Sequence, residues 1–303
     1  MSATNKTKQK AYLQLHIAVL LFGVTAILGK LITLEQTALV WNRLWIAILG
    51  LVFIPGVLKG ILNIKRINVL RFAGIGILVC LHWLAFYGSI KIGNNASVTL
   101  ACLATTSLFT SVLEPLITKS KFQWVELFLG LLVIVGIYFL SGVGDTFYMA
   151  IVVGLISAFL AALFSVLNKK YITGQNSISV SVIELGSGFL LLTILYPILQ
   201  YYLPQSQWFP TGNDWLWLFL LGWLCTSVAF VLSMEALKEI SAFISNLTIN
   251  LEPVYGILLV IWLLNEDADL NLDFYIGTSI ILFSVILHPI LVKVQKRRTL
   301  MAS

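Results

Sequence analysis

Long apolar stretches, each about as long as the hydrocarbon core of a bilayer is thick, follow one another along almost the whole chain. Hydrophobic residues fill 59% of the 303 positions and charged residues only 11%. A soluble domain carries about 25% charged residues, and its core cannot absorb so much apolar sequence. The chain is therefore predicted to be an all-α integral membrane protein.

Spanning the bilayer core takes about 20 apolar residues, and this rule predicts ten transmembrane helices. The first stretch follows three lysines, as a secretory signal would, but it is long for a signal and no small-x-small cleavage site precedes Lys30. We expect it to remain as a span. The ten predicted helices cover residues 12–32, 37–58, 69–90, 95–117, 124–142, 147–169, 178–200, 214–237, 241–264 and 274–292.

Lysine and arginine residues are distributed unevenly between the predicted connections. If the N-terminus is cytoplasmic, 16 of the 19 Lys and Arg residues lie on the inner side, and only Lys30 and Lys91 lie outside. The acidic residues at positions 35, 145, 214 and 266–273 gather outside. The positive-inside rule thus predicts that both termini are cytoplasmic. We expect a multi-pass protein of the plasma (inner) membrane.

The two halves of the chain resemble each other. Residues 28–30, Leu-Gly-Lys, correspond to 167–169, Leu-Asn-Lys, and Ile90-Lys91 corresponds to Leu237-Lys238. Each half, 1–143 and 144–303, holds five predicted spans, so the second half must enter the membrane upside down. Two inverted five-helix repeats are typical of secondary transporters, whose substrate site lies near the midplane between the repeats.

A helix end of the form Ala-Leu-Lys, at 236–238, precedes a polar-studded span that contains Glu252-Pro253 and is followed by Asn265-Glu266. In this order of motifs across ten spans, the chain resembles the EamA type of the drug/metabolite transporter superfamily. The resemblance implies a carrier that exports amino acids or related small metabolites, as members that are often proton-coupled do, and leaves the substrate open. The first half departs from the pattern: Thr106 stands in place of Pro253, Lys119 stands in place of Glu266, and Glu114-Pro115 comes about two turns too late.

Three charged side chains lie within predicted spans, at depths estimated from a rise of about 1.5 Å per residue. Arg43 and Glu252 lie roughly 9 and 12 Å from the outer surface, and Glu184 lies roughly 9 Å from the inner one. We expect Arg43 to pair with Glu252, or both to bind an amphoteric substrate. Glu252 and Glu184 are also candidates for the coupling proton, since burial disfavours a charged carboxylate. The alternative is that all three have structural roles.

Small polar residues mark one predicted span in each half. Asn246 and Asn250 share a face of span nine with Pro253, at spacings i, i+4 and i+7. Thr99 and Thr106 belong to a similar stripe on span four. We expect the two stripes to form opposite walls of a substrate cavity. The alternative is hydrogen bonding between packed helices, at about 2 kcal/mol or less for each bond.

His82, Trp83 and Tyr87 lie near the middle of span three. A histidine that titrates near neutral pH suits proton coupling, and His82 is a third candidate for that role. Trp83 and Tyr87, at i and i+4, are predicted to cage an apolar or cationic substrate. The alternatives are a neutral histidine bonded to a neighbour and ordinary aromatic packing.

Other classes of protein lack their sequence signatures. The net charge of +6 follows from membrane topology and does not indicate nucleic acid. No HExxH, paired-aspartate or Walker A motif is present, so we predict no enzyme and no cofactor. Cys80, Cys102 and Cys225 have no metal-ligand or disulfide spacing.

We expect a small-molecule carrier in the bilayer, as a monomer or weak dimer. An intramembrane enzyme and a channel or scaffold are the rivals outside carriers. A carrier for a nucleoside, vitamin or nucleotide-derived metabolite is the rival among carriers.

Overall fold

The structure is a computed structural model. It describes residues 3–93, 96–141, 148–202, 207–252 and 254–255, and parts of 272–291. In these residues the chain is helical, with no strand. The helices are α1 (Ala3–Leu31), α2 (Gln36–Val52), α3 (Val57–Asn63), α4 (Arg66–Gly93), α5 (Ala96–Ala104), α6 (Thr106–Thr118), α7 (Trp124–Ser141), α8 (Tyr148–Tyr171), α9 (Ser177–Tyr202), α10 (Asp214–Phe219), the π-helical segment η2 (Leu220–Val228), α11 (Ala229–Glu239) and α12 (Ala242–Ile249).

Six described helical stretches are long and apolar enough to cross a membrane, and two of them, Val98–Thr118 and Asp214–Glu239, run over more than one labelled element. A seventh span is reached if α2 and α3 count as one despite a bend of 97°. The all-helical, multi-pass prediction is thus confirmed. Parts of predicted spans nine and ten, 241–264 and 274–292, lie outside the described residues, so the count of ten stays a prediction. The division at 143/144 and the inversion of the second half also stay predictions.

Predicted span 37–58 differs from the structure at its end. The helix α2 stops at Val52, and α3 begins at Val57 after a turn through Pro55-Gly56. Proline cannot donate a main-chain hydrogen bond, and Gly56 adopts a left-handed φ of 85°, which favours glycine over residues with a side chain. These two residues end the helix although the sequence remains apolar.

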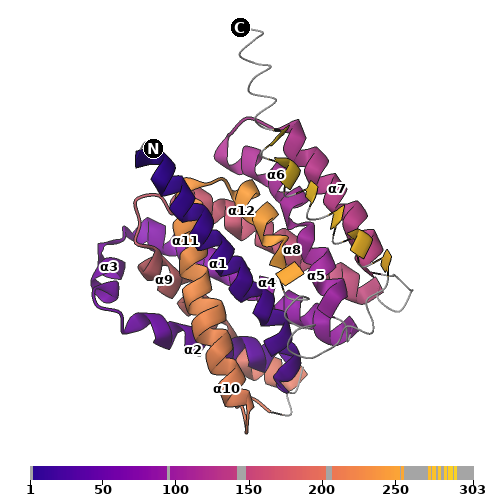
Figure 1. Cartoon of the computed structure of the whole chain (residues 1–303). Helices are drawn as coiled ribbons and strands as arrows, with labels where there is room; N and C mark the ends of the chain where they lie inside the picture. The colour runs from indigo at the N-terminus through magenta and orange to yellow at the C-terminus, as the bar shows by residue number, and fades with distance from the viewer. Residues whose placement is uncertain are drawn as a thin grey trace.

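The helices pack into one bundle (Figure 1). The helix α4 packs against both α8 and α9, and α1 lies along α11, so the two halves of the chain interlock. Close approach between α4 and α9 depends on Gly76, where an added Cβ would collide with the main-chain oxygen of Glu184. Small residues at membrane-helix interfaces commonly permit such close approach.

The helices α6 and α12 run side by side and are joined by a series of hydrogen bonds, here named the α6–α12 ladder. Glu114 accepts from the main-chain N–H groups of Ala242 (3.0 Å) and Phe243 (2.7 Å) at the start of α12. One turn further on, the Asn246 amide donates to Thr110 at 2.7 Å. The last bond runs from the Asn250 amide to the Ser107 hydroxyl at 3.0 Å. The ladder therefore joins predicted spans four and nine, one from each half.

Both helices break beyond the last bond of the ladder. The fourth span is interrupted at Thr105, between α5 and α6, and α12 ends at Ile249, before a turn at Asn250 and Leu251. Thr106 and Glu252 lie at these two breaks. Irregular backbone at membrane depth is tolerated where it is buried in protein or lines a cavity. We therefore expect a cavity beside the two breaks.

Candidate functional site

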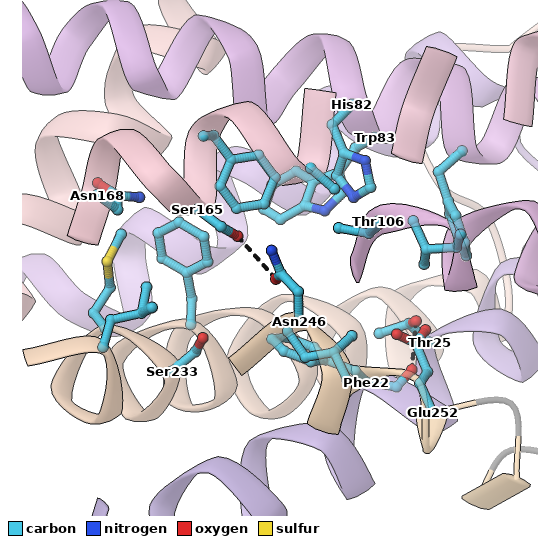
Figure 2. A pocket seen from close by; sticks show the side chains of 18 of the residues that line it. Phe22, Thr25, His82, Trp83, Thr106, Ser165, Asn168, Ser233, Asn246 and Glu252 are labelled. Carbon is cyan, nitrogen blue, oxygen red and sulfur yellow. Dashed lines mark hydrogen bonds between the residues drawn. The ribbon is translucent and has the colours of Figure 1, made fainter. Parts of the chain in front are cut away.

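A cavity lies beside the two breaks, and its empty space, including the part that opens to its surroundings, is ≈ 780 Å³. Its wall is built by α1, α2, α4, α5, α6, α8, α11 and α12, so both halves of the chain contribute. Figure 2 shows Asn168 at one end of the cavity, with Thr25 and Glu252 at the other. Six residues singled out from the sequence line it: Arg43, His82, Trp83, Thr106, Asn246 and Glu252.

Arg43 is a buried cation, 2% exposed, that reaches the cavity from α2. Its Nε donates to Thr226 at 2.7 Å and its Nη1 to the Tyr87 hydroxyl at 3.0 Å. The guanidinium carbon lies 3.9 Å from the centroid of the Trp83 ring. An arginine has five N–H donors, so these contacts orient the guanidinium and leave donors available for an anionic group.

The π-helical segment η2 places Thr226 against Arg43. In η2, the hydroxyls of Thr226 and Ser227 donate to main-chain oxygens five residues earlier. The same segment is fixed to α2, because Trp223 donates to the oxygen of Ile46 and Ser227 to that of Ala47. Single π-helical turns inside α-helices are often found at functional sites. Nothing in the sequence pattern identified Thr226.

Glu252 lines the same cavity and is 4% exposed. Among the described residues, the one ion pair within 4 Å joins Lys238 to Glu235, so Arg43 and Glu252 do not form one. Nor does any hydrogen bond between described residues involve the Glu252 carboxyl. The structure thus places a cation and a carboxyl in one cavity without joining them. Pro253 lies outside the described residues.

His82 is held by α8. Its Nδ1 lies 2.9 Å from the hydroxyl and 3.0 Å from the main-chain oxygen of Ser157, and the Ser157 hydroxyl lies 3.1 Å from the oxygen of His82. The ring also packs against Phe164, at 5.5 Å between centroids. These contacts resemble the neutral, bonded histidine that the sequence left open as the alternative to proton coupling.

Thr106 and Asn246 face the cavity with different surroundings. The Asn246 amide is engaged on both sides, since it donates to Thr110 and its oxygen accepts from Ser165 at 3.1 Å (Figure 2). The Thr106 hydroxyl, in a residue only 4% exposed, has no hydrogen-bond partner among the described residues. A buried hydroxyl without a partner is costly, which makes Thr106 available to a ligand.

The remaining predicted site residues are buried near the cavity without lining it. Tyr87 bonds Arg43, Thr99 bonds the Ser89 hydroxyl at 2.7 Å, and Asn250 bonds Ser107. The rings of Trp83 and Tyr87 lie near the guanidinium of Arg43, and the substrate cage expected from their spacing stays a prediction. Glu184 lies behind Asn168, which donates to its Oε2 at 3.1 Å.

The sequence did not single out most of the apolar wall of the cavity. Aromatic and aliphatic residues at ordinary span positions carry no signal that distinguishes a cavity wall from a lipid face or a helix contact. Within the described residues, no group of three or more His, Cys, Asp or Glu side chains is arranged to hold a metal ion. The lining residues that the sequence did not single out include Phe22, Phe164, Asn168, Phe230 and Met234.

Comparison with known proteins agrees with this architecture. The model of the EamA-like transporter family matches the chain twice, over residues 9–142 and 148–288. A solved structure titled only "Crystal structure of protein" covers 93% of this chain and 97% of its own, with a TM-score of 0.73 and 15% identity. At that identity the likeness concerns the fold alone. The comparison with curated proteins finds no match.

Proposed function

The chain belongs to the EamA-like transporter family of the drug/metabolite transporter superfamily, and from that premise we propose that it is a secondary active carrier that exports amino acids or related small metabolites by alternating access. The family supports a membrane transporter of small molecules. The substrate class, the direction and a coupling to protons are our proposal. So is the inverted pairing of the two repeats, which the breaks in spans four and nine support.

The observation that carries the proposal is that the guanidinium of Arg43 and the carboxyl of Glu252 line one cavity without being joined. Arg43 is oriented by Thr226, Tyr87 and Trp83 and still has donors to offer, while Glu252 has no bonded partner among the described residues. An amphoteric molecule would supply a partner for each side chain, with its carboxylate bound to Arg43 and its ammonium group bound to Glu252. The aromatic and aliphatic wall would cover the rest of such a molecule.

A carrier for a nucleoside, vitamin or nucleotide-derived metabolite is the second candidate. The observation that favours it is the aromatic lining: Phe86, Phe164 and Phe230 offer ring faces or edges to a planar base. A phosphate group would require more cations than the single buried Arg43 that the described lining contains. The uncharged members of this class are therefore the better fit.

A thermal-shift screen of the purified protein against amino acids, nucleosides and vitamins tests the proposal, because a ligand that binds only the folded state raises its stability. We expect amphoteric compounds to stabilise the wild type and not Arg43→Gln or Glu252→Gln. The matched controls are Arg66→Gln and Glu239→Gln, which change exposed residues of the same types. Compounds that stabilise the protein are then followed into proteoliposomes with and without a pH gradient. No solute movement for any of them would refute a carrier.

A further inference from the structure

Among the described residues, Glu184 is the most completely buried carboxyl that the proposed binding of substrate does not use. It lies on α9 with no exposed surface. Its Oε2 accepts from Asn168 at 3.1 Å, and its Oε1 has no partner. A buried ionised carboxylate with one hydrogen bond is strongly unfavourable unless a cation balances it.

No described cation approaches this carboxyl from the helices packed around α9, which include α2, α3, α4 and α11. Arg43 of α2 is bonded to Thr226 and Tyr87. The cations of α3 and α4, Lys59, Arg66, Arg71 and Lys91, are exposed, and His82 is bonded to Ser157. On α11, Lys238 pairs with Glu235, and Glu239 is exposed. On α8, Lys169 donates to the oxygens of Leu237 and Lys238, and Lys170 to that of Ile117.

Several polar atoms around Glu184 have no hydrogen-bond partner among the described residues. The Oδ1 of Asn168 is buried without a partner. So is the hydroxyl of Ser181, which lies one turn before Glu184 on the same side of α9. Elsewhere in this bundle, buried hydroxyls such as those of Thr110 and Thr226 donate to main-chain oxygens of their own helix. Two acceptor-only oxygens, Oε1 of Glu184 and Oδ1 of Asn168, thus have no donor, and a single proton on the carboxyl would supply one.

Asn168 connects this carboxyl with the cavity. It is 1% exposed, it lines the cavity, and it donates to Glu184 from the opposite side. Figure 2 shows it at the end of the cavity away from Glu252. The amide can present its N–H₂ group to an ionised Glu184, or turn and present its oxygen to a protonated one. Each orientation offers the opposite end of the amide to a molecule in the cavity.

We infer that Glu184 carries the coupling proton and that Asn168 is the positioning residue that links this proton to occupancy of the cavity. This inference rests on the proposed carrier function and separates the roles of the two carboxyls, with Glu252 binding substrate and Glu184 exchanging a proton. Protonation of Oε1 adds an O–H donor, Asn168 accepts it through Oδ1, and its N–H₂ then becomes available to substrate. Loss of the proton reverses each change.

An infrared titration of the purified protein in liposomes tests the proton site without any substrate. We expect a carbonyl band from a protonated carboxyl that changes with pH in the wild type and is lost in Glu184→Gln. The band should survive in Glu184→Asp, which keeps a titratable group, and in the exposed control Glu239→Gln. Asn168→Leu should shift the pH at which half of the band is lost. In Asn168→Gln, which keeps the amide, this midpoint should return at least part of the way to the wild-type value. An unchanged band in Glu184→Gln overturns the proton site, and an unchanged midpoint in Asn168→Leu overturns the link.

Transport with a radiolabelled mixture of the common amino acids tests the coupling itself. In Glu184→Gln proteoliposomes we expect exchange of label across the membrane to persist, while accumulation driven by a pH gradient falls to the level without a gradient. Accumulation equal to that of the wild type would overturn the inference and leave the carrier intact. If the wild type moves no amino acid, the proposed function fails, whereas the infrared titration still decides whether Glu184 exchanges a proton.

Discussion

Glu114 and Glu184 are both buried carboxyls near the same predicted face of the membrane, yet their surroundings differ. Glu114 receives two main-chain N–H groups at the start of α12, at 3.0 and 2.7 Å. Glu184 receives one side-chain amide, at 3.1 Å, and its second oxygen has no partner. One carboxyl is fully bonded and the other is half bonded.

The two carboxyls thus differ in the hydrogen-bond donors around them, although both are predicted near the same face of the membrane. The first amides of a helix lack intrahelical partners and lie at the positive end of its dipole, so they stabilise a carboxylate. Glu114 thereby fixes α12 to α6, and Lys169 completes the corner by donating to the last oxygens of α11. Glu184 has no comparable support, as expected for the carboxyl that we propose exchanges a proton.

Replacing Glu114 by alanine should have the largest effect on the folded state. The substitution removes two charge-assisted hydrogen bonds and exposes the first amides of α12 to an apolar site. We expect a loss of about 3 kcal/mol in the free energy of unfolding. Thermal unfolding of the purified protein in lipid measures the change, with Glu239→Ala as the exposed control. A melting temperature equal to that of the control would show that the α11–α12 corner does not depend on Glu114.

The same change at both carboxyls tests the comparison directly. At Glu114, glutamine turns an N–H₂ group toward a main-chain donor, and we expect a loss of about 2 kcal/mol. At Glu184, the glutamine oxygen still accepts from Asn168, and its N–H₂ group supplies a donor that the site lacks. Unfolding of Glu184→Gln should therefore stay within about 0.5 kcal/mol of the wild type. Equal losses at the two positions would contradict the distinction between them.

Smaller losses are expected along the α6–α12 ladder. Asn246 makes two side-chain bonds and Asn250 makes one. Bonds between membrane helices contribute about 0.6 kcal/mol on average, so Asn246→Leu should cost about 1 kcal/mol and Asn250→Leu about half as much. Unfolding measured on both variants checks the order. A larger cost at Asn250 would mean that the turn which follows α12, rather than the ladder, determines stability.

The smallest effect should come from Thr106→Val. The Thr106 hydroxyl has no partner to lose, so exchanging it for a methyl group should leave the unfolding free energy unchanged within about 0.5 kcal/mol. Thr99→Val is the matched comparison, because the Thr99 hydroxyl is bonded to Ser89 and should lose measurable stability. Thermal unfolding compares the two. A clear loss in Thr106→Val would reveal a bond that Thr106 makes in the membrane.

Much of the fold was predicted from the sequence, and the differences between prediction and structure have physical reasons. The predicted span 69–90 lies within α4 (Arg66–Gly93), because apolar length alone determines a membrane helix. The span predicted over 37–58 ends early, since proline and glycine at 55–56 act locally where hydropathy does not. The depth estimates placed Arg43 and Glu252 at similar levels, and in the structure both residues line one cavity. Their direct pairing, one of the two outcomes that we expected, does not occur among the described residues.

The site was harder to predict than the fold. Spacing along a helix tells which residues share a face, but not which helix covers that face. The spacing of Trp83 and Tyr87 predicted that they cage a substrate, and only the structure shows that Arg43 lies against both rings. Likewise Glu114, which in the sequence imitates the Glu252-Pro253 motif, is the anchor of α12 in the structure.

The sequence by itself determined a helical multi-pass membrane protein of the EamA-like transporter family, with its rare charges within the spans. Apolar length, charge and motif order are enough for these conclusions, because the bilayer excludes most other structures. Only the tertiary structure decided the partner of each buried polar group. In a membrane bundle the lipid-facing and protein-facing sides of a helix are similarly apolar, so the sequence does not mark which side is buried. The partners, in turn, distinguish Glu114, which holds two helices together, from Glu184 and Glu252.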